Sequence, residues 1–320
     1  MKNKPIIIIA TEPNSILLEI FFKALKIVKC KSPLVLICCK KILIKEMNKY
    51  KFKKKINILN LNKIKKYNLN NKYINLIDIE CKKINNKYVT KFTNQYIEKS
   101  FDIALNLIKK NFSKKVINGP LNKKTFLNKK FLGITEYLSN KCKTKKTGML
   151  IYNKNLSVCP VTTHLPIKLV AKKISKKLVK EKIHIVHNFY KKNLKIKPTI
   201  AVTGLNPHCE SILKFNEDEK IIKPAIRDMQ NKRINVKGPF SADTIFSNKN
   251  RKIYDVVIGM YHDQVLTPIK TLFEFDAINI TMGLSFLRIT PDHGPNSIMK
   301  DRNLSDPTSF IRALEFLDNR

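Results

Sequence analysis

The apolar residues of this chain fall into short runs separated by polar segments with a helical pattern. Between the runs, residues 96–112, 165–179 and 307–317 repeat apolar positions three and four apart, which predicts amphipathic helices. Alternation of strands and helices predicts an α/β fold with a mostly parallel sheet. Eight runs have the length and β-branched content of buried strands: PIIIIA (5–10), PLVLICC (33–39), KVING (115–119), GMLIY (148–152), SVCPVTT (157–163), TIAVTGL (199–205), YDVVIGM (254–260) and AINIT (277–281).

The chain is longer than one hydrophobic core usually serves. Its 320 residues predict two domains, and we place the crossing between them near residues 130–150. We find no internal repeat in the sequence. The Lys- and Asn-rich stretch from about Asn62 to Lys87 is interpreted as solvated surface and loop, not as an independent module.

The net charge is strongly positive. The chain has 63 Lys and Arg residues against 24 Asp and Glu, a formal charge of +39, and such a balance is typical of nucleic-acid-binding proteins. Only seven of the basic residues are Arg, the side chain best suited to base edges and phosphates. The lysines are spread along the whole chain among many Asn and Ile residues, which are amino acids of A+T-rich codons. A composition bias of the genome explains this better, so we expect no specific nucleic acid partner.

Membrane and secretion signals are missing from the sequence. No apolar run approaches the roughly 18 residues that a membrane-spanning helix needs. The isoleucines at 6–9 follow a basic start, but the apolar region is too short for a signal peptide and no small-residue cleavage site follows. The seven cysteines include no CxxC pair, which indicates reduced thiols. We expect a soluble cytoplasmic protein that does not bind a membrane.

Glycine is scarce, so each position carries information about backbone freedom. The chain has eight glycines, none before Gly119, and seven of them lie in polar, motif-like segments. Neither GxGxxG nor GxxxxGK[ST] occurs. A dinucleotide would therefore not bind here in the Rossmann manner.

Three of the six histidines lie at equivalent places, each in the loop directly after a predicted apolar strand. They end the segments SVCPVTTH (His164), TIAVTGLNPH (His208) and YDVVIGMYH (His262). Ligands collect beyond the carboxyl ends of strands in open α/β sheets, so three such imidazoles can converge on one ion. Three histidines with open coordination positions suit a catalytic metal. His184 and His187 lie on a predicted helix and are interpreted as surface or packing residues.

Five motifs occur in a fixed order and resemble the 4-hydroxythreonine-4-phosphate dehydrogenase family over nearly the whole chain. They are V-T-T-H-L-P (161–166), G-L-N-P-H (204–208), G-P-x-x-A-D-T (238–244), Y-H-D-Q (261–264) and N-I-T-x-G-L-x-F-x-R (279–288). The resemblance implies two α/β/α domains of the isocitrate/isopropylmalate dehydrogenase type, not a Rossmann fold. Residues 1–135 with about 285–320 would form the first domain. Residues from about 136 to 284 would form the second, with the metal-binding histidines and the active site in the cleft.

The same resemblance implies partners and site residues. It implies a homodimer with a shared active site, and a divalent metal bound by histidines of both subunits, zinc first and magnesium or cobalt as alternatives. Carried over position by position, the metal ligands match His164, His208 and His262. The segment similar to the family's cofactor loop is Asp292, His293 and Gly294. The substrate contacts match Thr135, Lys270, Asn279 and Arg288.

The implied reaction is the oxidation of 4-phosphooxy-L-threonine with NAD or NADP. Decarboxylation to 3-amino-2-oxopropyl phosphate would follow, as a step of pyridoxal 5'-phosphate synthesis. A metal would lower the pKa of the hydroxyl that loses hydride. Lys270 and Arg288 are cations suited to the phosphate and carboxylate of the substrate, and Lys270 can also act as an acid or base. Asp243 and Asp263 are candidates for orienting an imidazole or accepting a proton.

The chain departs from the family pattern in its loops. Where relatives have Gly-His-Thr-Glu, it has Gly-Ile-Thr-Glu at 133–136, so an expected substrate-binding histidine is replaced by Ile134. A Gly-rich loop near the N-terminus has become TEPNSILLEI, and the small residues after NPH have become CESIL. Because isoleucine has no hydrogen-bonding group, we expect weaker substrate affinity. Fewer glycines also limit close backbone approach to a phosphate.

Other functions fit parts of the same pattern. A related metal-dependent oxidative decarboxylase could act on another phosphorylated hydroxy acid. Three histidines with an activated water would suit a zinc hydrolase, which would need neither the Lys, Asn and Arg trio nor a second cofactor. A basic nucleic-acid-binding protein is the least favoured hypothesis, and its binding would survive mutation of the three histidines.

Overall fold

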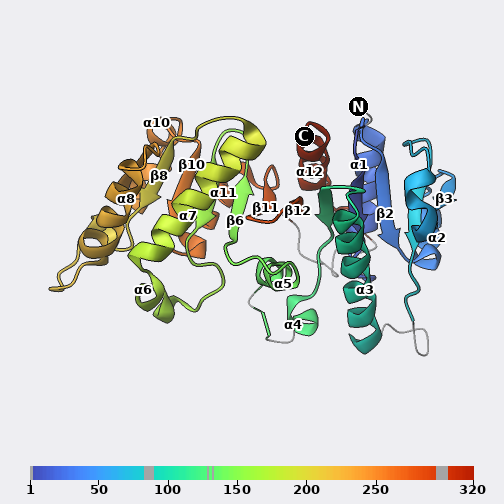
Figure 1. Cartoon of the computed structure of the whole chain (residues 1–320), viewed down its shortest axis with the longest axis horizontal. Helices are drawn as coiled ribbons and strands as arrows, with labels where there is room; N and C mark the ends of the chain where they lie inside the picture. Colours follow the sequence, from blue (N-terminus) through green and yellow to red (C-terminus); the bar gives the residue numbers. More distant parts are fainter. Residues whose placement is uncertain (1–2, 83–89, 128–129, 132, 293–301) are drawn as a thin grey trace. The chain divides into compact units, whose positions relative to one another are not determined.

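The computed structural model covers the chain in two compact units. The described residues are 3–82, 90–127, 130–131, 133–292 and 302–320. The first unit comprises residues 1–130 and 285–320, and the second comprises residues 131–284. Each unit has strands covered by helices (Figure 1).

In the described part of the first unit the strands pair in parallel, in the order β3-β4-β2-β1-β5-β12. All four isoleucines of β1 are fully buried, as expected for a central parallel strand that helices cover on both faces. The strands are β1 (Ile6–Ile9), β2 (Leu34–Cys38), β3 (Ile56–Ile58), β4 (Ile74–Asp78), β5 (Lys115–Asn118) and β12 (Leu287–Pro291).

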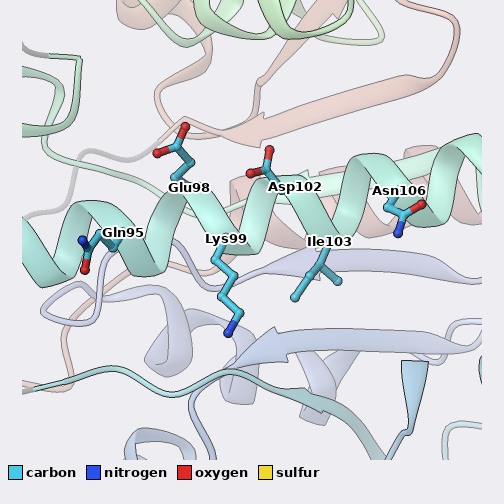
Figure 2. A pocket seen from close by; sticks show the side chains of 6 residues that line it. All are labelled: Gln95, Glu98, Lys99, Asp102, Ile103 and Asn106. Atoms are coloured by element: carbon cyan, nitrogen blue, oxygen red, sulfur yellow. The ribbon is translucent and has the colours of Figure 1, made fainter. Parts of the chain in front are cut away.

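Its helices are α1 (Leu17–Ile27), α2 (Lys40–Lys49), the 3-10 helix η1 (Leu61–Lys66), α3 (Thr90–Lys109), α4 (Lys123–Phe126) and α12 (Thr308–Asp318). Helices α1 and α12 pack together, with the rings of Phe21 and Phe310 in an edge contact at 6.0 Å between centroids. Helix α3 lies against β1 and β2. An open depression of about 420 Å³ lies on the polar side of α3. Figure 2 shows the side chains that line it, none of which is a predicted site residue: Gln95, Glu98, Lys99, Asp102, Ile103 and Asn106.

The second unit has a mixed sheet in the order β11-β6-β7-β10-β8-β9. The pairs β11/β6 and β6/β7 are antiparallel, and the remaining pairs are parallel. The strands are β6 (Gly148–Tyr152), β7 (Ser157–Pro160), β8 (Ile200–Thr203), β9 (Val236–Phe240), β10 (Val256–Gly259) and β11 (Ile278–Met282).

Helices cover both faces of this sheet. Met149 of β6 joins Val265 and Ile269 of α11 in one apolar cluster, whereas Gly148, the preceding residue, faces Lys182 and Ile185 of α7. Because neighbouring strand residues point to opposite faces, α7 and α11 lie on opposite sides. The helices are α5 (Ile134–Lys141), η2 (Ile167–Leu169), α6 (Val170–Lys173), α7 (Lys176–Phe189), η3 (Tyr190–Leu194), η4 (Pro207–Cys209), η5 (Asp218–Ile222), α8 (Lys223–Gln230), α9 (Ala242–Ile245), α10 (Asn248–Arg251) and α11 (His262–Phe273).

The predicted α/β fold class is confirmed, and each of the eight predicted strands is present. The interpretation of residues 62–87 as surface and loop is wrong for β4, which pairs with β2 and β3. Four of the five side chains of β4 are buried although Lys and Asn surround them. Hydropathy averaged over the long stretch hid a strand of five residues.

The predicted helices at 96–112 and 307–317 correspond to α3 and α12, but the single helix predicted over 165–179 is wrong. The chain forms η2 and α6 there and leaves the helical conformation at Ile174. Ser175 then caps α7, because its Oγ accepts a hydrogen bond from Leu178 N at 3.3 Å. In the described part of the chain, no helix has the length and apolar character required to cross a membrane.

The buried position of β4 gives a stability test. Leu76 is fully buried, so Leu76→Ala should lower the free energy of unfolding of the protein by about 3 kcal/mol through lost burial and a residual cavity. Urea unfolding measures this change. Ile58→Ala on β3 is the control, since Ile58 is 48% exposed and should cost much less. Equal losses in the two variants would contradict a core role for β4.

Candidate active site

Three neighbouring strands bring the three predicted histidines to one edge of the second unit's sheet. Strand β10 pairs in parallel with β7 on one side and with β8 on the other. His164 follows β7, His262 follows β10 and His208 follows β8. The carboxyl ends of parallel neighbours lie at the same edge, which is where ligands bind in α/β sheets.

His164 and His262 lie close together at this edge. Their ring centroids are 5.6 Å apart, with an interplanar angle of 39°. His262 opens α11, and its Nδ1 is 2.6 Å from Asp263 Oδ1. A β-carbon on Gly133 would lie 3.1 Å from His164 Cε1 and 2.9 Å from Glu136 Oε2. Gly133 therefore places the start of α5 in close contact with the imidazole, and a larger residue there would require the His164 or Glu136 side chain to shift.

His208 lies in η4, in the left-handed conformation, with φ of 55°. Its Nδ1 is 3.9 Å from Asp243 Oδ2, and both side chains are exposed. A hydrogen bond from Ser241 Oγ to Asp243 Oδ1, at 2.5 Å, lowers the pKa of the Asp243 carboxyl. Asp243 is thus a carboxylate at neutral pH, beside an imidazole.

The described residues contain no group of three or more His, Cys, Asp or Glu side chains placed to hold a metal ion. Of the three predicted ligands, His164 lies beside His262, whereas His208 lies beside Asp243. Convergence of all three histidines on one ion therefore remains a prediction.

A buried carboxylate holds the loop that carries His208. Asp218 is fully buried, and its oxygens accept hydrogen bonds from Leu205 N at 2.6 Å, Asn206 N at 3.1 Å and Asn206 Nδ2 at 2.9 Å. Two backbone N–H groups and one amide of the G-L-N-P-H motif are thereby satisfied by a single side chain. These contacts fix the backbone directly before His208.

Polar groups also gather where α5 meets β11. Thr135 Oγ1 lies 3.4 Å from Thr281 Oγ1, and Asn279 is two residues before Thr281 on the same face of β11. Asn279 Oδ1 and Glu136 Oε2 are buried, and neither has a hydrogen-bond partner. Buried polar atoms rarely lack partners, so these two oxygens indicate a place for a polar ligand. Ile134, by contrast, is 7% exposed and belongs to the core.

Lys270 lies on α11, half-buried and eight residues after His262, or about 12 Å along the helix. Arg288 lies in the first unit, on β12. It is 2% exposed, and its Nε donates to Asn118 Oδ1 at 2.6 Å. Thr290 Oγ1 donates to the same oxygen at 3.2 Å, so Asn118 fixes the guanidinium.

Of the predicted cofactor segment, only Asp292 is described. Its backbone N donates to Ser309 Oγ at 2.7 Å, which ties the end of β12 to α12. His293 and Gly294 lie outside the described residues.

Sequence reasoning missed several residues that contact or flank the predicted site residues within each unit, namely Asn118, Glu136, Asp218, Gln264 and Thr281. Glu136, Gln264 and Thr281 stand inside the G-I-T-E, Y-H-D-Q and N-I-T segments, which gave a signal. Their hydrogen-bond partners lie in distant parts of the chain, so the local sequence pattern could not show them.

Comparison with known proteins decides the family. The sequence model of the family described as pyridoxal phosphate biosynthetic protein PdxA matches residues 29–317. The chain belongs to this family. The family recognised from the five motifs is thereby confirmed, together with its α/β fold.

Similar individual proteins include two curated relatives and one solved structure. The 4-hydroxythreonine-4-phosphate dehydrogenase of Sulfurihydrogenibium sp. is 37% identical over 204 residues, or 62% of this chain and 63% of the relative. The chain thus matches less than two thirds of that relative's length. The protein of the same name from Wigglesworthia glossinidia brevipalpis is 32% identical over 89% of this chain and 87% of its own. The crystal structure of the Klebsiella pneumoniae 4-hydroxythreonine-4-phosphate dehydrogenase superposes with a TM-score of 0.84 at 26% identity, covering 98% and 97% of the two chains.

The role of Asp218 in holding the His208 loop can be tested by measuring the stability of the protein. Asp218→Asn replaces an acceptor oxygen by an NH₂ group that faces N–H donors, and should lower the free energy of unfolding by about 2–3 kcal/mol. Thermal and urea unfolding measure the change. Glu219→Gln is the control, because Glu219 forms only an exposed pair with Lys223 and its loss should leave the melting temperature unchanged. Equal stability of the two variants would show that the buried carboxylate does not hold the loop.

Proposed function

We propose that the protein is a 4-hydroxythreonine-4-phosphate dehydrogenase. It would oxidise 4-phosphooxy-L-threonine with NAD, or NADP, and the product would lose carbon dioxide to give 3-amino-2-oxopropyl phosphate for pyridoxal 5'-phosphate synthesis. The observation that carries the proposal is the His164–His262 pair at the strand edge of a chain that belongs to this family. The names of the relatives support the same activity.

The donor set at this edge fits a divalent metal. Two imidazoles lie side by side, a third stands on the neighbouring strand end, and the Asp243 and Asp263 carboxylates flank them. Imidazole nitrogen suits zinc or cobalt, and the carboxylates would also admit magnesium. His164, His208 and His262 would hold the ion. When bound, it would supply Lewis acidity to the oxygen at the carbon that is oxidised.

The chain's own residues would bind and orient the substrate. Thr135 of α5 presents a hydroxyl, and Asn279 of β11 presents an unpartnered amide oxygen. Arg288, held by Asn118, offers a guanidinium to the phosphate or carboxylate, and Lys270 adds a second cation. Asp243 is an ionised carboxylate beside His208 and is suited to orient this imidazole. Lys270 and Asp243 are the acid–base candidates that the sequence gives.

The nicotinamide cofactor and the assembly complete the proposal. Asp292, His293 and Gly294 would form part of the cofactor site. We further propose that the protein works in the cytoplasm as a homodimer, in which histidines of both copies complete the ligand set. Within one chain His164 lies beside His262 and His208 lies beside Asp243, which is consistent with a site that a second copy completes.

The proposed reaction predicts NADH formation from NAD and 4-phosphooxy-L-threonine in the presence of zinc or magnesium. Absorbance at the NADH band measures it. Activity should disappear with a chelator and in His208→Ala, because a metal ligand is lost. His184→Ala should keep full activity, since His184 is exposed on α7, where its Nε2 lies 2.9 Å from Asn188 Nδ2.

The opposite results separate the alternatives. Metal-dependent hydrolysis without NAD would favour the zinc hydrolase. Oxidation of another phosphorylated hydroxy acid, with none of 4-phosphooxy-L-threonine, would favour the related decarboxylase. Activity that persists in His208→Ala would contradict the ligand set.

Arg288 gives a second kinetic test. Arg288→Lys keeps the charge but loses the planar fork and the Nε–H bond to Asn118, so kcat/KM should fall about 10- to 100-fold, mostly through KM. Steady-state kinetics with NAD saturating measure the change. Arg320→Lys, at the exposed C-terminal residue, should leave both constants unchanged. An unaltered KM in a folded Arg288→Lys variant would remove Arg288 from the substrate site.

A further inference from the structure

One side chain connects two of the three histidine-bearing strand ends. We propose that Gln264 is a positioning residue, which fixes the His208 loop against the start of the helix that carries His262. The inference rests on the proposed metal site, and it adds a residue that supports the ligands without touching the ion.

The contacts of Gln264 define this role. Its Oε1 accepts hydrogen bonds from Met260 N at 2.6 Å and from Thr203 Oγ1 at 2.9 Å. Its Nε2 donates to Gly204 O at 2.7 Å. Met260 N can only donate and Gly204 O can only accept, so the orientation of the amide follows from its partners. Three of the four hydrogen bonds that a glutamine amide can make are thereby used on two neighbouring strand ends.

The same network continues to the third strand end. Met260 O accepts from Thr162 Oγ1 at 2.7 Å and from Thr162 N at 3.2 Å. Thr162 lies two residues before His164, Met260 two before His262, and Gly204 four before His208. One chain of hydrogen bonds therefore runs from the His164 loop through Met260 and Gln264 to the His208 loop. Thr162 and Thr203 are both buried, at 4% and 0% exposure, so water competes little for these bonds.

Backbone packing at this point explains why a side chain from the first turn of α11 can reach both strands. A β-carbon on Gly259, the last residue of β10, would lie 2.3 Å from Val265 Cγ1 and 3.0 Å from Gln264 Oε1. Glycine at the end of β10 thus allows α11 to begin directly over the strand. The Gln264 amide then lies level with the ends of β8 and β10.

A metal-binding experiment tests the role. Zinc affinity of the whole protein is measured by competition with a chromogenic chelator, and Co²⁺ replaces zinc for visible spectra. Gln264→Met keeps the length of the side chain but removes its three hydrogen bonds. The zinc Kd should rise about tenfold or more, and the Co²⁺ bands should shift, as expected when a group that orients metal ligands is lost.

Gln230→Met is the matched control. Gln230 also bonds to strand backbone, donating to Val236 O at 2.8 Å, but this lies where β9 begins, at the opposite end of the parallel strands from the histidines. Its loss should change the melting temperature of the metal-free protein without changing zinc affinity or the Co²⁺ spectrum. A merely structural role of Gln264 would give the same result as this control.

Thr203→Val is a milder variant, and it tests the role of Gln264 even if Gln264→Met does not fold. Valine has the shape of threonine and suits a buried strand, and it removes only the bond to Gln264 Oε1. The zinc Kd should rise about threefold. In the double variant the rise should be no larger than in Gln264→Met alone, because the shared bond is already lost.

The outcomes separate the two levels of the proposal. Wild-type zinc affinity and Co²⁺ spectrum in folded Gln264→Met, or in Thr203→Val where the first variant does not fold, would overturn the role of Gln264. Failure of the wild-type protein to bind zinc or cobalt would overturn the metal site itself, and the role of Gln264 with it.

Discussion

The candidate site depends on the parallel register of β7, β10 and β8. Because these strands pair directly and run in the same direction, their carboxyl ends lie at one edge, and each continues into a loop with one histidine. A change of direction in any one strand would carry its histidine to the opposite edge of the sheet. All three strands are buried along their whole length, and Val257 pairs with Val158 on one side and with Ala201 on the other. The apolar core thus determines where the polar chemistry can occur.

Much of the fold could be predicted from sequence because eight of its strands lie in continuous apolar runs. The strands β3, β4, β9 and β12 were missed, since Lys, Asn, Gly or Pro residues stand within or beside them and give no clear periodicity. The helix boundary at Ser175 was missed because the apolar spacing continues across it, whereas the break is made by a serine hydrogen bond. In both cases pairing or capping by specific neighbours determined the structure, and average hydropathy did not.

Among the candidate site residues, sequence reasoning found those whose side-chain type indicates a chemical role, such as His164 and Arg288. It did not find the residues that hold them. Asn118 is hydrogen-bonded to Arg288, which lies 170 positions away in the sequence, and Gln264 is hydrogen-bonded to Thr203, which lies 61 positions away. Neither asparagine nor glutamine has a reactive group, so only the folded structure shows what each amide contacts.

The loop of His208 adopts a backbone conformation that its composition does not favour. His208 and Cys209 both have positive φ, 55° and 62°, a region that costs residues with a β-carbon about 1–2 kcal/mol each. No glycine is available at 209–213 to relieve this cost. The bonds from Leu205 and Asn206 to Asp218, and from Gln264 to Gly204, act on the residues just before the strained pair. Hydrogen bonds contribute about 0.5–1.5 kcal/mol each, and more when one partner is charged, so together they match the strain. In a chain this poor in glycine, buried polar side chains can therefore hold the conformation that places His208 at the strand edge.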